Sequence, residues 1–155
     1  MSNGGFIQRG GWWVVAQNAL ILAVLVLGPL FRGQWQNAAI SIAGGVLLSV
    51  GGCLVIAGVC ALGRNLTPYP KPLEDSKFVQ RGVYALVRHP LYSSLMFAST
   101  GWALHWRSWP ALAAALALAI LLDAKARREE RWLREKFPDY DAYSRRVRRL
   151  LPWIY

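Results

Sequence analysis

Two short groups of polar residues lie beside long apolar runs and are the part of the chain best suited to chemistry. The first group contains Arg88 and His89, and the second is the acidic pair Glu129-Glu130. Pro90 cannot donate a backbone hydrogen bond and restricts the residue before it, so we expect His89 to be extended and outside regular helix. Irregular backbone beside a membrane span persists only where it lines a cavity or is covered by protein. The first group therefore predicts the rim of a binding site.

The two glutamates have different predicted surroundings. Glu129 falls within an apolar stripe at helical spacing, where a carboxylate needs a cationic partner such as Arg88 or the ammonium group of a ligand. Glu130 can equally lie on a solvated helix face and pair with Arg134, four residues further on. His89 has three roles open to it: proton acceptor, ligand contact or helix-capping residue. The pattern thus predicts a functional role for Glu129.

Composition places these groups in an integral membrane protein. The chain has 155 residues, 55% of them hydrophobic, and a net charge of +10, with apolar and charged residues segregated along it. Two charge-free runs reach the roughly 20 apolar residues that cross a bilayer, and two shorter runs follow. We predict a single all-α domain, 1–155, with four transmembrane helices and a cytoplasmic C-terminal helical extension. The predicted spans are 12–31, 38–62, 91–106 and 109–123, with a loop at 63–90 and the extension at 124–155.

Local signals add detail to these elements. The fourth run is expected to continue as one helix to Pro138, and a last short basic helix is expected over 139–151. Three closely spaced prolines near residue 70 predict an extended, stiff loop. In the second span, small residues recur at every fourth position and predict a face that another helix can approach closely. These residues are Ser41, Gly45, Ser49, Cys53, Ala57 and Ala61.

Positive charge sets the expected orientation. Sixteen of the eighteen lysines and arginines lie before the first span, in the 63–90 loop or after the fourth span. Only Arg32 and Arg107 fall at the opposite ends of the helices. Because positive residues favour the cytoplasmic side, both termini and the polar groups are expected to face the cytoplasm. The expected location is the inner membrane of a prokaryote.

Several function classes lack support. Motifs typical of serine hydrolases, phosphate-binding loops and zinc sites do not occur. No metal site is expected, because His105 lies at the opposite side of the membrane from His89 in this topology. Cys53 and Cys60 both lie in the second span, where small apolar packing residues are the simplest interpretation. The basic C-terminus beside a membrane favours contact with anionic lipid headgroups over nucleic acid.

From Leu62 to Trp153 the chain resembles the isoprenylcysteine carboxyl methyltransferase family of membrane enzymes, and it is similar to the related phospholipid N-methyltransferases. The resemblance covers over half of the chain, in order, and the combination of its Arg-His-Pro and Glu-Glu elements is specific. The matching residues are Leu62-Gly63-Arg64-Asn65-Leu66, Gly82-Val83-Tyr84, Arg88-His89-Pro90-Leu91-Tyr92, Glu129-Glu130, Leu133, Phe137, Tyr140, Tyr143 and Pro152.

The resemblance implies S-adenosylmethionine as the methyl donor, bound at the cytoplasmic side. We expect catalytic roles for Arg88 and His89, and we expect Arg88 to contact either the carboxylate of the donor or an anionic acceptor. Lys125 stands where related enzymes place a substrate-contacting arginine. A lysine keeps the positive charge but cannot make the bidentate hydrogen bonds of a guanidinium group. The implied cofactor-binding residues are Tyr69, Phe78, Val79, Tyr84, His89, Pro90, Leu91, Tyr92, Glu129 and Glu130.

The predicted function is methylation of a lipophilic or membrane-resident acceptor, through a carboxylate, thiol or amine. Only an amine has to lose a proton, and His89 is the nearest group to take it. Three alternatives stay open: a phospholipid amine N-methyltransferase, an NADPH-dependent enzyme like the sterol reductases, and a non-catalytic scaffold that binds anionic membrane lipid. The sequence gives no oligomeric state.

Overall fold

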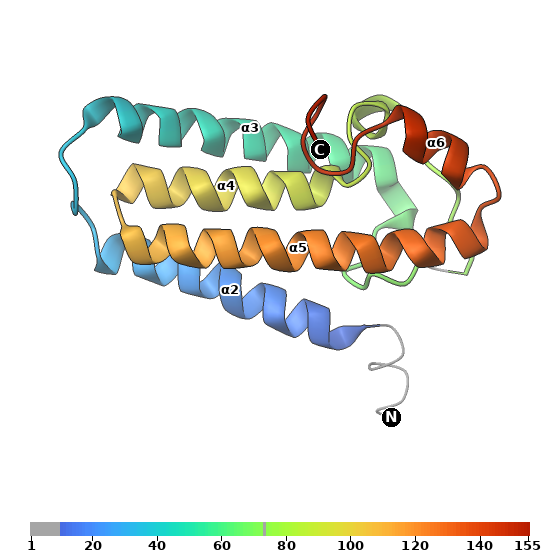
Figure 1. Ribbon diagram of the computed structural model, residues 1–155, viewed down its shortest axis with the longest axis horizontal. Coiled ribbons are helices and arrows are strands. Elements are labelled where there is room, and N and C mark those ends of the chain that lie inside the picture. Colours follow the sequence, from blue (N-terminus) through green and yellow to red (C-terminus); the bar gives the residue numbers. More distant parts are fainter. Residues whose placement is uncertain (1–9, 73) are drawn as a thin grey trace.

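The computed structural model describes residues 10–72 and 74–155, and in these residues the fold is all-α, as predicted (Figure 1). Five α-helices and two short 3-10 helices, η1 and η2, make up the regular structure, and no strand occurs in the described ranges. In chain order the elements are α2 (Gly11–Leu30), α3 (Ala38–Leu62), η1 (Gly63–Asn65), η2 (Gly82–Ala85), α4 (Pro90–Trp106), α5 (Trp109–Lys136) and α6 (Tyr140–Arg146).

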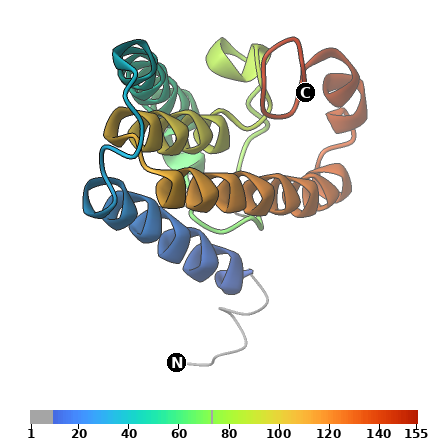
Figure 2. The same cartoon turned by 60° about the vertical axis from the view of Figure 1, so that its left-hand side comes forward.

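The four long helices run side by side in a bundle, with α4 packed against α3 and α2 packed against α5 (Figures 1 and 2). Three helices are both long and apolar enough to cross a membrane: α2, α3 together with η1, and α5. The helix α4 has only 17 residues and is not among these three, so the fourth membrane crossing stays a prediction. The predicted orientation also stays a prediction, and for the amino terminus it concerns residues 1–9, which lie outside the described ranges.

Capping residues explain where the helices begin. The Asn37 side chain accepts hydrogen bonds from the backbone N–H groups of Ala39 and Ile40, which starts α3. Ser108 caps α5 in the same way, and its hydroxyl also donates to the carbonyl of Leu27 in α2. Pro90 occupies the first turn of α4, where a missing N–H costs nothing. These local signals give helix bounds within a few residues of the predicted ones.

The face of α3 that meets α4 is not the predicted one. Its buried residues are Gly44, Gly51 and Gly58, which recur every seventh position, and none belongs to the predicted every-fourth stripe. A Cβ atom on Gly44 would lie 2.6 Å from the backbone nitrogen of His105, so the two backbones are in near contact. Cys53 and Cys60 are exposed on the outer face of α3 and do not pack in the core. A heptad spacing keeps one face toward a neighbour over a long helix better than a tetrad spacing does.

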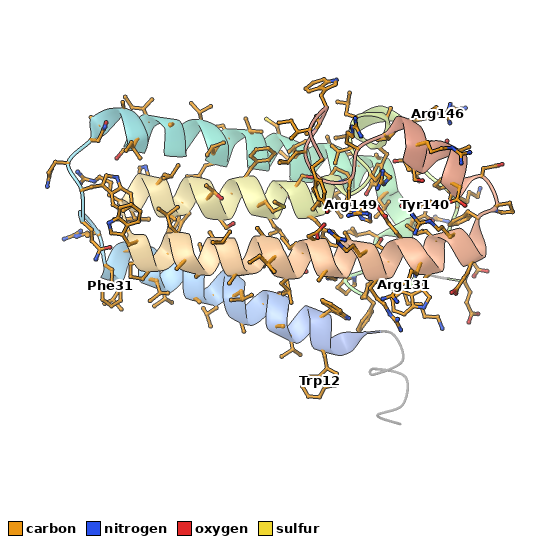
Figure 3. The ribbon with its side chains drawn as sticks, viewed as in Figure 1. Trp12, Phe31, Arg131, Tyr140, Arg146 and Arg149 are labelled. Atoms are coloured by element: carbon orange, nitrogen blue, oxygen red, sulfur yellow. The ribbon has the colours of Figure 1, made fainter. Side chains whose placement is uncertain are left out.

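The loop at 63–90, the charged end of α5 and α6 all gather at one end of the bundle (Figure 1). Arg131, Tyr140, Arg146 and Arg149 lie at this end, far from Phe31 (Figure 3). The predicted continuation of α5 to Pro138 is confirmed, since the helix ends at Lys136.

The predicted last helix, 139–151, is too long, because α6 ends at Arg146. The chain is extended after it, and the backbone carbonyls of Arg148 and Arg149 accept hydrogen bonds from the N–H groups of Arg88 and His89.

The contact between α3 and α4 predicts that the same substitution has different effects on stability at two neighbouring glycines. Gly44→Ala places a methyl group against backbone that has no room to move, and overpacking of this kind costs about 1–3 kcal/mol. Gly45→Ala is the matched control, because a Cβ there meets nothing within 4 Å. Unfolding of the purified protein in detergent measures both, and equal stability of the two variants would contradict the close approach.

Candidate functional site

A cavity opens at the polar end of the bundle, between the 65–79 loop, the segment before α4, the acidic stretch of α5 and α6. Its empty volume, including the open mouth, is about 800 Å³, within the range of sites for small ligands. The structure brings together most of the predicted site residues along this cavity: Tyr69, Phe78, Val79, Tyr84, Arg88, His89, Leu91, Tyr92 and Glu129. Three predicted residues lie outside its lining: Pro90, Lys125 and Glu130.

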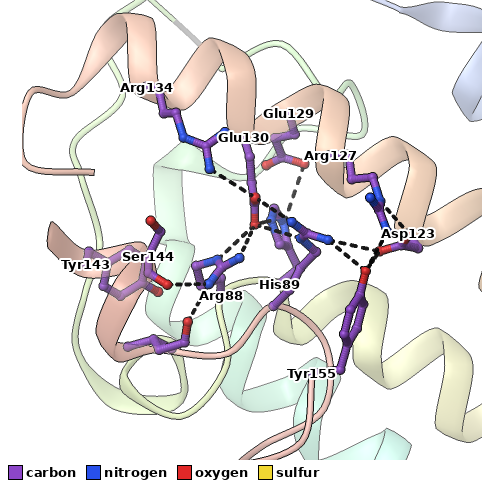
Figure 4. A network of polar contacts seen from close by, with 12 residues as sticks. Arg88, His89, Asp123, Arg127, Glu129, Glu130, Arg134, Tyr143, Ser144 and Tyr155 are labelled. Atoms are coloured by element: carbon purple, nitrogen blue, oxygen red, sulfur yellow. Dashed lines mark hydrogen bonds and ion pairs between the residues drawn. The ribbon is translucent and has the colours of Figure 1, made fainter. Parts of the chain in front are cut away.

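Glu130 is buried behind the cavity wall at the centre of an ion cluster (Figure 4). Its carboxylate accepts hydrogen bonds from Arg88 Nε at 2.8 Å and from Arg149 Nε at 3.1 Å, and His89 Nε2 lies 3.3 Å away. Its side chain is only 1% exposed, so these cations supply the compensation that a buried carboxylate requires. The second oxygen accepts from Arg149 Nη2 at 3.2 Å, which makes that contact bidentate.

Glu129 lines the cavity and is the more accessible carboxylate. Its side chain is 24% exposed, and its Oε2 atom accepts a hydrogen bond of 2.6 Å from the Tyr92 hydroxyl. The Nδ1 atom of His89 lies 3.8 Å from the same oxygen. Among the described residues, Tyr92 is the one hydrogen-bond donor to Glu129. This carboxylate therefore retains acceptor capacity toward a ligand.

The structure gives the two acidic residues different surroundings. Glu129 does face a binding site, as expected, but its predicted partner Arg88 pairs with Glu130 instead. Glu130 was open to a solvated position beside Arg134, yet it is fully buried, and Arg134 reaches it only at 3.7 Å. Residues 126 and 130 are one helical turn apart and both face the interior, which turns Glu129 toward the cavity.

Arg88 has little capacity left for a ligand. Its guanidinium donates to Glu130, and its Nη1 donates to the backbone carbonyls of Ser144 and Val147. The side chain thus joins α5 to the end of α6 and the residue after it. Such saturation favours a positioning role for Arg88 over the predicted contact with an acceptor.

Lys125 is also engaged within the protein. It is 1% exposed, and its ammonium donates to the Gln17 side chain at 2.7 Å and to the carbonyl of Pro68 at 3.2 Å. The same ammonium lies 5.1 Å from the centre of the Tyr92 ring, and Lys125 is not among the residues that line the cavity. Lys125 therefore ties α2 and the proline loop to α5, and its predicted contact with a substrate stays untested.

The loop over the cavity is closed by a side-chain bridge. Asn65 accepts a hydrogen bond from the backbone N–H of Lys77 and donates to the carbonyl of the same residue. Lys136 holds the loop from the other side, because its ammonium donates to the Glu74 carbonyl and the Ser76 hydroxyl. The predicted stiffness of this loop has a structural counterpart in the buried ring of Pro70.

Aromatic rings form one wall of the cavity, and sequence reasoning did not assign most of them to the site. Phe78 stacks on Phe137 with ring centres 5.0 Å apart, and Tyr140 and Tyr143 lie within 6 Å of Phe78. The Tyr143 hydroxyl donates to the backbone carbonyl of Tyr84 at 2.6 Å. Burial raises the pKa of Tyr84, Tyr140 and Tyr143 well above the ordinary value, so all three stay protonated. The sequence did contain one signal for them, because Phe137, Tyr140 and Tyr143 are among the residues that match the family.

Arg149 is the site residue with no signal in the sequence. It lies in a stretch of basic residues that was assigned to lipid headgroups, yet it reaches Glu130 and also donates to Asp123 and the Tyr155 hydroxyl. Its side chain is 19% exposed, in contrast to the exposed Arg145, Arg146 and Arg148 nearby. A single member of a basic run can thus serve the site while its neighbours face solvent.

The structure is thus a helical bundle with three helices long and apolar enough to cross a membrane, and with a charged and aromatic cavity at one end. The sequence model of the phospholipid methyltransferase family matches residues 39–140, which include Arg88, His89 and both glutamates. The chain belongs to this family, as the resemblance to membrane methyltransferases predicted.

Two curated relatives match nearly the whole chain. It is 29% identical over 148 residues to the nickel-cobalt-cadmium resistance protein NccN of Alcaligenes xylosoxydans xylosoxydans. It is 32% identical over 148 residues to the cobalt-zinc-cadmium resistance protein CzcN of Cupriavidus metallidurans. Each match covers 94% of this chain but only 65% and 64% of the respective relative. The chain thus spans about two thirds of the length of these relatives.

Two tyrosines in the aromatic wall give a matched test of this geometry. Tyr143→Phe removes the donor to the buried Tyr84 carbonyl and should lower the free energy of unfolding by about 1–3 kcal/mol. Tyr140→Phe removes a buried hydroxyl that has no hydrogen-bond partner among the described residues, so stability should stay the same or rise. Thermal unfolding without ligand measures both variants. A larger loss for Tyr140→Phe would contradict the assignment of these hydroxyls.

Proposed function

We propose that the protein transfers a methyl group from S-adenosylmethionine to a lipophilic or membrane-resident acceptor in this cavity. The observation that carries the proposal is Glu129, a carboxylate with spare acceptor capacity among aromatic rings, in a chain of the phospholipid methyltransferase family. The donor carries an ammonium group and a sulfonium, and both are cations that such a site attracts.

The proposed placement of the donor follows from charge. Its ammonium would meet Glu129, where a charge-assisted hydrogen bond is available. Its sulfonium would lie near the rings of Tyr84 and Tyr92, because aromatic faces attract cations. The loop closed by Asn65 would cover the donor, which enters from the polar end of the bundle. The acceptor would approach from the membrane, between helices.

The reaction asks the protein mainly for alignment. The acceptor atom attacks the methyl carbon as the carbon–sulfur bond breaks, and the sulfonium becomes a neutral thioether. Correct placement of two reactants can supply about 7–11 kcal/mol of the barrier. The buried ion cluster and the packed end of α4 give the cavity the rigid walls that alignment needs.

The charges of the site favour an amine among the three possible acceptor groups. A carboxylate acceptor calls for a cation in the cavity, but Arg88 and Lys125 are both held by protein groups. Of the titratable groups that line the cavity, Glu129 and His89 lie against its α5 wall, whereas Lys77 is an exposed residue of the covering loop. A neutral amine loses one proton during methylation, and His89 is placed to accept it.

Donor binding is the first test. We expect Glu129→Gln to weaken binding of S-adenosylhomocysteine to purified protein by at least tenfold, because a neutral amide cannot pair with the ligand ammonium. Glu135→Gln is the matched control on the exposed face of the same helix and should bind as the wild type does. Calorimetry measures each affinity.

Wild-type protein that binds NADPH in place of S-adenosylhomocysteine would favour the reductase alternative. Wild-type protein that binds neither would favour the lipid scaffold.

The acceptor can be found by labelling. Purified protein is incubated with S-adenosylmethionine carrying a labelled methyl group and with membrane extract from cells grown with and without cobalt. The metal-stress extract is included because the two relatives are named for metal resistance. We expect label on a lipid-soluble amine, and label only on a carboxylate ester would contradict the amine assignment.

A further inference from the structure

We propose that Arg149, acting through Glu130, is a positioning residue that holds His89 with its proton on Nε2 and leaves Nδ1 to accept a proton in the cavity. The chemical use of Nδ1 depends on the proposed methylation of an amine. The arrangement of the three side chains stands on the geometry alone. The C-terminal segment, 147–155, would thereby complete the site.

The carboxylate of Glu130 fixes the nature of the histidine nitrogen that faces it. An ionised carboxylate only accepts hydrogen bonds, and Arg88 and Arg149 keep this one ionised by their close contact. His89 Nε2 lies 3.3 Å from Glu130 Oε1. A lone pair at that nitrogen would face the carboxylate oxygen and be repelled, so the proton belongs on Nε2.

The other ring nitrogen faces the cavity. His89 Nδ1 lies on the side of Glu129, 3.8 Å from its Oε2 atom, and both residues line the cavity whereas Glu130 does not. The ring is stacked on Tyr92 at 5.3 Å and nearly parallel to it, and its side chain is 5% exposed. The backbone N–H of His89 donates to the carbonyl of Arg149 at 3.1 Å. The ring is therefore held against a flip from several sides.

Arg149 is the member of the cluster that anchors Glu130 from outside the bundle. It contacts both carboxylate oxygens, and it is held in turn by Asp123 and the Tyr155 hydroxyl. Arg88 alone would leave Glu130 Oε2 without a close cation, since Arg134 lies 3.7 Å from it. Without Arg149, the carboxylate could rotate away from His89, and the proton would no longer be confined to Nε2.

The proton transfer balances without any further reagent. The lone pair of the amine forms a bond to the methyl carbon, and the carbon–sulfur electron pair stays on sulfur. The proton of the methylated ammonium passes to His89 Nδ1, and the imidazolium that results is stabilised by Glu130 at Nε2. The proton then leaves to water through the mouth of the cavity.

Nuclear magnetic resonance of histidine-labelled protein tests the proposal directly. The chain has two histidines, His89 and His105, and the second lies at the far end of α4 from the cavity. His105→Gln therefore assigns the ring nitrogen signals. At mildly alkaline pH we expect His89 in the wild type to show one protonated nitrogen, Nε2, and one unprotonated nitrogen, Nδ1. A proton on Nδ1, or a ring doubly protonated at every pH, would overturn the proposal.

Two substitutions distinguish a positioning role of Arg149 from a purely structural one. Arg149→Gln should convert His89 to a mixture of tautomers and lower kcat by about 10–100-fold at an unchanged KM for the donor. Arg145→Gln removes the same charge from an exposed neighbour and should change neither. If Arg149→Gln does not fold, Arg149→Lys can be used instead. It keeps the positive charge without the bidentate contact to Glu130, and it should still give a partial mixture of the two His89 tautomers.

If His89 carries its proton only on Nε2 in either variant at position 149, as in the wild type, the proposal is contradicted. Wild-type protein that shows the expected tautomer but binds no methyl donor would instead refute only the proposed function.

Discussion

A buried carboxylate, Glu130, is the constraint on which the site depends. A charge removed from water must be paired. Glu130 lies in α5, and its partners come from two other parts of the chain: Arg88 before α4 and Arg149 after α6. Breaking one partner leaves an unpaired charge in a place that water reaches poorly. The ion cluster therefore fixes the relative positions of these segments, and the cavity lies between them.

The helices of the bundle bring these segments to the same place. The near contact at Gly44 and Gly51 holds α4 against α3, and His89 is the residue immediately before the first turn of α4. The single long helix α5 runs from its apolar part directly into the acidic pair, so no flexible joint separates membrane packing from the site. The result is a rigid wall of one carboxylate, one histidine and several aromatic rings, which suits a reaction limited mainly by alignment.

Much of the architecture could be predicted from the sequence because its signals are local. Asn37, Pro90 and Pro138 mark helix ends by rules that need no tertiary structure, and the bounds of α3 agree with the predicted 38–62. The cavity residues were predicted from the resemblance to a family. Distant contacts could not be inferred in this way. A helical stripe continues from Ala126 to either of the next two acids, and only packing shows that Glu130 is the buried one.

Arg149 could not be separated from its basic neighbours, because its role depends on a hydrogen-bond pairing between segments about 60 residues apart.

The most direct measurement of the central claim is an experimental structure of the protein with S-adenosylhomocysteine bound. We predict the ligand in the cavity between the 65–79 loop and α5, with its amino group in contact with Glu129 and with Glu130 still paired to Arg88 and Arg149. A ligand bound elsewhere, or one that replaces Arg88 on Glu130, would contradict the account.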